Sequence, residues 1–301
     1  MTGRPSRRTV LIGGAAGLVC LAAAAVGGVE AGLLPGRPGL DHALGLDDVD
    51  GDRPSTEPGP VDYHSFDSTA RGRRVSWGLF RPDDRPAKGL PVVLSLHGRG
   101  GDARSTHDVL LADAYLADHV RRGGAPLVIV SVDGADTYWH PRRDGDDPLA
   151  MILDELLPRV GDLGARVDRV GVVGYSMGGY AGLMLARESE ADRLGGLRVA
   201  AAAASSPALF ASAAASSPGA FDGPADWHRW GDLAAHPQVA RTPLHVDCGT
   251  SDPFAEQTRR YRRNCARTPA GGFSKGGHHP DYWRSVLPDQ LTFLSQQLSG
   301  G

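Results

Sequence analysis

Residues 174–179 read Gly-Tyr-Ser-Met-Gly-Gly and constrain the fold more than any other segment of the chain. They follow the apolar run 170–173 and precede the small, apolar stretch 180–186. A serine between glycines at this spacing is typical of a nucleophile elbow, a sharp turn from a buried strand into a helix. The glycines avoid clashes across the turn, which lifts the Ser176 hydroxyl above the sheet edge. The alternative, an incidental serine in a glycine-rich turn, fits this strand-and-helix context less well.

Apolar segments alternate with helical patterns along most of the chain. This alternation predicts an α/β fold, a mostly parallel central sheet flanked by helices on both faces. A small insertion at 208–240 precedes the last core strand and is a candidate lid. The expected strands are 75–80, 91–96, 127–132, 170–173, 199–204 and 244–247, and the expected helices include 108–121 and 149–157.

The N-terminal segment resembles a twin-arginine export signal. Arg7 and Arg8 precede a mildly hydrophobic, Gly/Ala-rich stretch that runs to about residue 29, with small residues for cleavage at Val29 and Ala31. The alternatives are an uncleaved membrane anchor through residues 10–29 and an incidental hydrophobic start. We therefore expect an export signal or anchor at 1–31, a flexible linker at 32–60 and a catalytic domain at 61–301, secreted or in the cell envelope.

Charge and cysteine content limit the partners. The formal net charge is −3 and no long basic run occurs, so nucleic acid is not an expected partner. Cys20 lies in the export signal, which leaves Cys248 and Cys265 as a pair. In an oxidising compartment this pair predicts a disulfide, with two free buried thiols as the alternative. No CxxC or HxxxH pair accompanies them, so the sequence predicts no metal site.

A serine nucleophile needs a base and an orienting acid. His278 and His279 follow two glycines in a late loop, where the flexible backbone lets an imidazole reach over the sheet. His278 is the favoured base, because Pro280 biases His279 towards an extended conformation that suits a wall residue. Asp252 follows the last core strand, at the carboxyl end where ligand-facing groups of parallel sheets collect, and is the favoured acid.

Backbone amides must also stabilise a developing negative oxygen. The segment 97–101, His-Gly-Arg-Gly-Gly, follows a buried strand and predicts one donor from Arg99 or Gly100 and another from Met177. A phosphate-binding loop is the rival interpretation, but no Gly-Lys-Ser/Thr follows. The predicted substrate contacts are Trp139, His140, His279 and Trp283. For the segment 137–141, which holds the first two, a packed aromatic turn is an equal alternative. Trp283 is also expected to pack beneath the histidine loop and hold His278.

As a set, these motifs resemble the esterase D-like α/β-hydrolases, a group that includes feruloyl esterases and secreted mycolyltransferases. The resemblance spans about residues 75–298 and implies an α/β-hydrolase fold. It also implies ester hydrolysis or acyl transfer through an acyl-serine without a cofactor, on a small-molecule or cell-envelope ester. It matches Ser176 to the nucleophile, Asp252 to the acid and His278 to the base. The chain departs from the family in having a second histidine after His278, and no segment marks a mycolyltransferase lipid site. A cell-envelope acyltransferase and a non-catalytic envelope-binding protein stay as alternatives.

Overall fold

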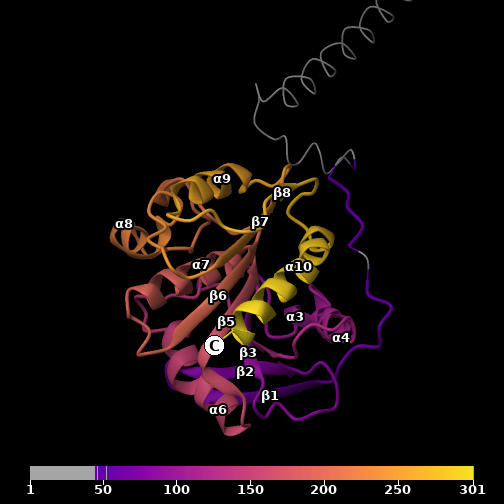
Figure 1. Ribbon diagram of the computed structural model, residues 1–301. Coiled ribbons are helices and arrows are strands. Elements are labelled where there is room, and N and C mark those ends of the chain that lie inside the picture. Colours follow the sequence, from indigo (N-terminus) through magenta and orange to yellow (C-terminus); the bar gives the residue numbers. More distant parts are fainter. Residues whose placement is uncertain (1–44, 46, 52, 301) are drawn as a thin grey trace, which may run out of the picture.

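The central element is an eight-stranded sheet with the strand order β1-β2-β4-β3-β5-β6-β7-β8 (Figure 1). The computed structural model describes residues 45, 47–51 and 53–300. Strand β2 pairs antiparallel with both of its neighbours, β1 and β4, and all the other pairs are parallel, which confirms the predicted mostly parallel sheet. The strands are β1 Val61–Ser68, β2 Arg73–Phe80, β3 Pro91–Leu96, β4 Val128–Val132, β5 Arg166–Tyr175, β6 Arg198–Ser205, β7 Leu244–Gly249 and β8 Phe273–Ser274.

Helices cover both faces of the sheet (Figure 1). One face packs against α4 (Ala112–Arg121) and α10 (Pro280–Ser299), with α3 (Ser105–Asp108) beside them. The other face packs against η1 (Met151–Leu156), α6 (Leu157–Asp162), α7 (Met177–Glu190) and α9 (Ala255–Asn264). Between β6 and β7, the insertion 208–240 holds η2 (Ala213–Ala215), α8 (Pro224–Asp226) and η3 (Trp227–Gly231), and α5 (Pro148–Ala150) precedes η1.

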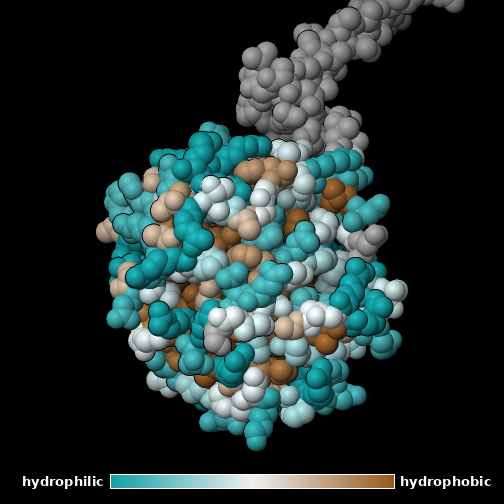
Figure 2. Space-filling view, in the orientation of Figure 1, coloured by the Kyte–Doolittle hydropathy of each residue, from teal (hydrophilic) through white to brown (hydrophobic). Residues whose placement is uncertain are grey.

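The core follows the strand periodicity. In β6, alternate alanines face opposite helical layers: Ala202 and Ala204 pack on the α7 side, and Ala201 and Ala203 pack on the α10 side. Such small side chains let helices approach the sheet closely on both faces. Leu163 is the only large hydrophobic side chain exposed among the described residues. The space-filling view accordingly shows a mainly hydrophilic surface with small, separated hydrophobic spots (Figure 2).

The differences from the sequence expectations include β1, the two-residue strand β8 and the start of α4. The sequence analysis did not identify β1, because this edge strand is largely polar and lacks an apolar run. Only its Phe66 and Ser68 side chains are buried. The helix expected at 108–121 begins instead at Ala112, because Leu111 adopts a left-handed conformation with φ of 52°. Side chains with a Cβ rarely adopt this conformation, and it separates α4 from the short α3.

A buried carboxylate anchors the insertion to α7. The Glu188 side chain is 1 % exposed and accepts hydrogen bonds from Arg229, Arg193 and Arg187. Burial alone would raise the pKa of this carboxyl, but the hydrogen bonds from Arg229 and Arg193 lower it from the ordinary 4.5 to about 2. The charged form therefore stabilises the fold above pH 4.5, and this stabilisation is lost as the pH falls towards 2.

Glu188→Gln is expected to lower the free energy of unfolding at pH 7 by about 3 kcal/mol, because the arginines lose their shared counter-charge. Denaturant unfolding at pH 7 and again near pH 2.5 measures the effect. The difference from wild type should shrink at the lower pH, where the wild-type carboxyl begins to protonate. The exposed Glu256→Gln on α9 is the control. Equal stability of both variants at pH 7 would show that the anchor contributes nothing.

Part of the predicted linker packs on the domain. Its described residues form no helix or strand, yet Asp47 is buried and Thr56 donates a hydrogen bond to Asp118. The Gly59 amide donates to the Asp113 carbonyl. The predicted export signal or anchor, including Cys20 and residues 10–29, lies outside the described residues. Within the described part of the chain, no helix combines the length and apolar character needed to cross a membrane.

The predicted disulfide is wrong, because Cys248 and Cys265 are both free thiols. Cys248 lies near the carboxyl end of β7, whereas Cys265 follows the ten-residue helix α9. The Cys248 thiol contacts Thr258 in α9, and Cys265 lies seven residues further along. At a rise of about 1.5 Å per residue this is about 10 Å, whereas bonded cysteines need Cβ atoms about 4 Å apart. Burial raises the pKa of the Cys265 thiol to about 11, which also makes it a poor nucleophile for oxidation.

Candidate active site

Ser176 lies at the turn between β5 and α7 in a strained backbone conformation. Its φ is 55° and its ψ is −120°. The neighbouring glycines are required at this turn, because a Cβ on Gly174 would overlap the Gly178 backbone and one on Gly178 would overlap the Leu96 carbonyl. This geometry is that of the predicted elbow, in which backbone strain keeps the serine hydroxyl clear of the sheet.

Gly178→Ala is expected to destabilise the fold by about 3 kcal/mol or more, because the backbone of β3 has no room to move away from the new methyl group. Gly182→Ala is the matched control on the same helix, since its Cβ would meet its nearest neighbour, a Val172 methyl, at an ordinary 3.4 Å. Thermal unfolding of both variants measures the difference. A Gly178→Ala melting temperature equal to that of the control would contradict the close approach of α7 to β3.

Three side chains from separate loops form one hydrogen-bonded chain. His278 Nε2 lies 2.9 Å from Ser176 Oγ, and His278 Nδ1 lies 2.9 Å from Asp252 Oδ2. The carboxylate can only accept, so Nδ1 carries a proton and Nε2 presents its lone pair to the serine hydroxyl. The Asp252 side chain is fully buried, whereas His278 is about one quarter exposed at 26 %. These contacts are the ones that a nucleophile, a base and an orienting acid require.

Neighbouring groups hold the acid and the histidine in place. The second Asp252 oxygen accepts from the Phe254 amide at 2.8 Å. The His278 ring packs edge-to-face against Phe254 and Trp283, each with ring centroids 5.2 Å apart. Trp283 in turn stacks on Tyr175 at 4.4 Å. Trp283 therefore packs beneath His278, as expected, and its 7 % exposure makes it a support for the histidine more than a surface for substrate.

The loop 97–101 lies directly beside the serine. A Cβ on Gly98 would come within 3.3 Å of Ser176 Cβ. The Gly100 amide donates to Asp136 Oδ1 at 2.6 Å, so this predicted donor already has a partner. Arg99 is then the candidate donor from this loop. Met177 is the first residue of α7, where helical amides have no partner within the helix.

His97 fixes the base of this loop. It is buried, its Nε2 accepts from the Gly134 amide at 2.9 Å, and its Nδ1 lies 2.7 Å from the Gly98 carbonyl oxygen. Because Nε2 accepts, the ring proton sits on Nδ1 and is donated to Gly98. Burial lowers the pKa of His97, so the ring stays neutral. His97 therefore has a structural role in this loop.

Trp139 and His140 lie beneath the surface. They are 1 % and 0 % exposed. Trp139 Nε1 donates to the His97 carbonyl at 3.4 Å, and His140 stacks on the rings of Phe221 and Trp230 from the insertion. The structure thus places these two predicted substrate contacts behind the 97–101 loop and the insertion, where they brace both.

His279 caps the start of α10 and faces Asp47. Its backbone is extended, with φ of −148° and ψ of 162°, as expected for a residue before proline. Its Nε2 lies 3.3 Å from the Asp47 carbonyl oxygen and 3.8 Å from the Asp47 carboxylate. A Cβ on Gly277 would overlap that carboxylate. The segment before β1 therefore packs directly against the loop that carries His278.

The sequence analysis did not identify Phe254, Tyr175, Asp136 or Asp47 as site neighbours. Phe254 has a local signal, since it lies two residues after Asp252. Tyr175 precedes the serine, yet its packing on Trp283 joins residues more than one hundred positions apart. Only the fold brings Asp136 and Asp47 to the site.

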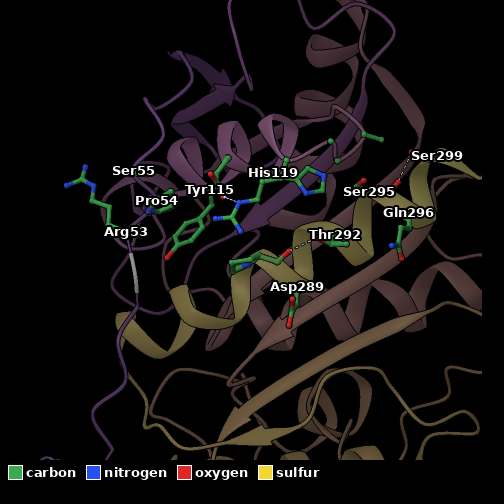
Figure 3. Close-up of a pocket in the computed structure, with 16 residues that line it drawn as sticks. Arg53, Pro54, Ser55, Tyr115, His119, Asp289, Thr292, Ser295, Gln296 and Ser299 are labelled. Carbon is green, nitrogen blue, oxygen red and sulfur yellow. Dashed lines mark hydrogen bonds and ion pairs between the residues drawn. The ribbon is translucent and has the colours of Figure 1, made fainter.

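A separate groove lies away from this centre. It has a volume of about 860 Å³, lies between α4 and α10, and is bordered by Arg53, Pro54 and Ser55 (Figure 3). His119 and Ser295 line opposite walls. None of the predicted site residues lines it, and it shares no residue with the hydrogen-bonded chain at Ser176.

Comparisons with known proteins agree with the fold and identify a family. The family model described as "Putative esterase" matches residues 68–294. A ferulic acid esterase structure superposes with a TM-score of 0.63 at 18% identity, covering 80% of this chain and 100% of that one. An S-formylglutathione hydrolase from Agrobacterium tumefaciens gives 0.62 at 17% identity, covering 82% and 98%.

A third structure, the fluorophosphonate-binding serine hydrolase FphF of Staphylococcus aureus, gives a TM-score of 0.62 at 18% identity over 79% of this chain and 99% of that one. At these identities the structures show the fold alone. A search of curated protein sequences finds no match. The family match covers most of the chain and includes Ser176, Asp252 and His278. The chain therefore belongs to the esterase D-like esterases and is an enzyme with the α/β-hydrolase fold.

Proposed function

We propose that the protein is an exported serine hydrolase of carboxylic esters that works through an acyl-serine intermediate. The observation that carries the proposal is the chain of two 2.9 Å contacts from Asp252 through His278 to Ser176, set on a strained elbow. A buried acid, a partly exposed base and a raised hydroxyl are the parts that acyl transfer needs.

The chemistry follows from which atoms face one another. Ser176 Oγ attacks the ester carbonyl carbon while His278 Nε2 takes the hydroxyl proton. The carbonyl oxygen becomes negative, and the Arg99 and Met177 amides donate to it. When the tetrahedral intermediate collapses, the bond to the alcohol oxygen breaks and His278 returns the proton to the leaving alcohol. Water then attacks the acyl-serine in the same way and releases the acid.

Asp252 stabilises the cationic imidazole without taking its proton. The carboxylate holds Nδ1–H, so the ring keeps the orientation and tautomer in which Nε2 faces Ser176. Full burial of the Asp252 side chain removes competing water and strengthens this interaction. No step of this reaction needs a cofactor.

Two measurements test the proposal. A panel of p-nitrophenyl esters of increasing acyl length reports turnover, and a fluorophosphonate probe followed by peptide mass spectrometry reports the reactive residue. We expect turnover and a single adduct on Ser176. Added alcohols that divert most of the acyl group from water would favour the alternative of acyl transfer. Absence of both turnover and adduct would favour the non-catalytic alternative.

Export through the twin-arginine route is part of the same proposal and rests on Arg7 and Arg8. Replacing both with lysine is expected to keep the protein in the cytoplasm, because the translocase reads the arginine pair itself and not its charge alone. Cell fractionation with an esterase assay measures this. A single Arg4→Lys change, outside the pair, is the control. Normal export of the double variant would refute the twin-arginine interpretation.

A further inference from the structure

We propose that Asp136 is a positioning residue, whose carboxylate fixes the 97–101 loop so that the Arg99 amide faces the reacting carbonyl oxygen. The inference rests on the proposed function, because it assigns how one amide of the oxyanion site is held. Nothing in the sequence motifs marks Asp136, which lies in the loop after β4.

The Asp136 carboxylate bridges two consecutive residues of the loop. One oxygen accepts from the Gly100 amide at 2.6 Å. The other lies 3.7 Å from Nε of the Arg99 guanidinium. A short hydrogen bond from an amide to a carboxylate is stronger than one between neutral groups. This bridge therefore ties the backbone and the side chain of the loop to a single anchor.

The orientation of the Arg99 amide follows from the peptide plane. The Gly98 carbonyl and the Arg99 amide belong to one trans peptide unit, so they point in opposite directions. The carbonyl accepts from the Gly101 amide at 3.1 Å and lies 2.7 Å from His97 Nδ1. With the carbonyl held on that side, the Arg99 amide points to the other. Gly98 itself lies against Ser176, because a Cβ on Gly98 would be only 3.3 Å from the Ser176 Cβ.

Asp136 is presented from a loop with little freedom to move. Ala135, Tyr138 and Trp139 all have positive φ, at 44°, 55° and 62°. Such strained backbone persists only where the surroundings hold it, and it clusters at functional sites. Two further hydrogen bonds connect the loop after β4 to the 97–101 loop. The Gly134 amide donates to His97 Nε2, and Trp139 Nε1 donates to the His97 carbonyl.

The exposure of the Arg99 and Asp136 side chains distinguishes a positioning role for Asp136 from a role in global stability. The Arg99 and Asp136 side chains are about half exposed, at 47 % and 51 %. Ion pairs with this exposure contribute little to global stability, because water screens them. Loss of the carboxylate should therefore leave the fold intact. It should affect the step in which the carbonyl oxygen becomes charged, since preorganised amides act at that point.

The test compares Asp136→Ala with Asp136→Asn and with the control Asp83→Ala. Asp83 has the same pattern far from the site: its exposed carboxylate accepts from the Arg85 amide at 3.0 Å and pairs with the Arg85 guanidinium. We expect Asp136→Ala to lower kcat roughly ten- to a hundredfold, with KM within about twofold, since misaligning a donor costs less than deleting it. Asp136→Asn keeps an oxygen for the Gly100 amide and should retain most of the activity. The control should equal wild type.

A transition-state analogue gives the specific readout. A trifluoromethyl ketone adds to the serine and carries a charged oxygen, so its affinity for Asp136→Ala should fall by about the same factor as kcat/KM. Wild-type kcat, an unchanged analogue affinity, or an Asp136→Asn as poor as Asp136→Ala would overturn the proposal. Fluorophosphonate labelling of Ser176 in each variant separates this failure from failure of the proposed function, which would leave even the wild-type serine unlabelled.

Discussion

Replacing Ser176 with alanine is expected to lower kcat by about 10⁴–10⁶ while the protein stays folded. The hydroxyl is the group that forms the bond to the acyl carbon, and neither His278 nor Asp252 can replace it. Alanine fits the strained turn as well as serine does, because both have an unbranched Cβ and alanine only lacks the hydroxyl. Initial rates with a p-nitrophenyl ester give the loss of activity, and thermal unfolding reports the fold.

The matched control is Ser285→Ala, which removes the hydroxyl of an exposed residue that donates to the Tyr282 carbonyl within α10. This variant should keep wild-type kcat. If Ser176→Ala retained more than about a tenth of the wild-type rate, Ser176 would not be the nucleophile. The strand–turn–helix geometry would still stand, but its catalytic interpretation would not.

Replacing His278 with alanine is expected to lower kcat by about 10⁴–10⁶, whereas His279→Ala should cost about tenfold or less. The two neighbours face different partners. His278 joins Ser176 to Asp252 through both ring nitrogens, and His279 turns towards Asp47 on the other side of the loop. The predicted asymmetry follows from this divergence of adjacent side chains.

The pair of variants is its own control, because each removes an imidazole from the same loop. Rates at saturating and at low ester concentration separate kcat from KM, and His279→Ala should affect KM more than kcat. An inactive His279→Ala beside an active His278→Ala would place the base one residue later. In that case the fold would be unchanged, but the assignment of the loop would be wrong.

The meeting of Ser176, His278 and Asp252 could be predicted from the sequence because each residue has a local signal. A serine between glycines after an apolar run, an aspartate after the last core strand and a histidine after two glycines each lie on a loop at the carboxyl end of the sheet. Parallel topology then brings these loops together without further information. Alternating apolar and helical segments likewise predicted the parallel sheet, and the place of Trp283 after the histidine loop predicted its packing beneath His278.

Predictions that depended on side-chain direction were weaker. Trp139 and His140 follow a strand end, as site residues do, but positive φ at Trp139 and stacking of His140 under the insertion bury both. Cys248 and Cys265 are close in sequence, yet the helix between them separates their thiols. Asp136 carries no motif, since its partner amide at Gly100 lies 36 residues away. Such contacts depend on tertiary packing, which composition and spacing do not encode locally.

The measurement that tests the central claim most directly is the mass of the enzyme during turnover. Wild-type protein mixed with excess p-nitrophenyl ester and quenched in acid should gain the mass of one acyl group less one hydrogen, on the peptide that contains Ser176. The adduct should be absent from Ser176→Ala. Wild-type turnover with no adduct, or with an adduct on any other residue, would contradict an acyl-serine mechanism at this elbow.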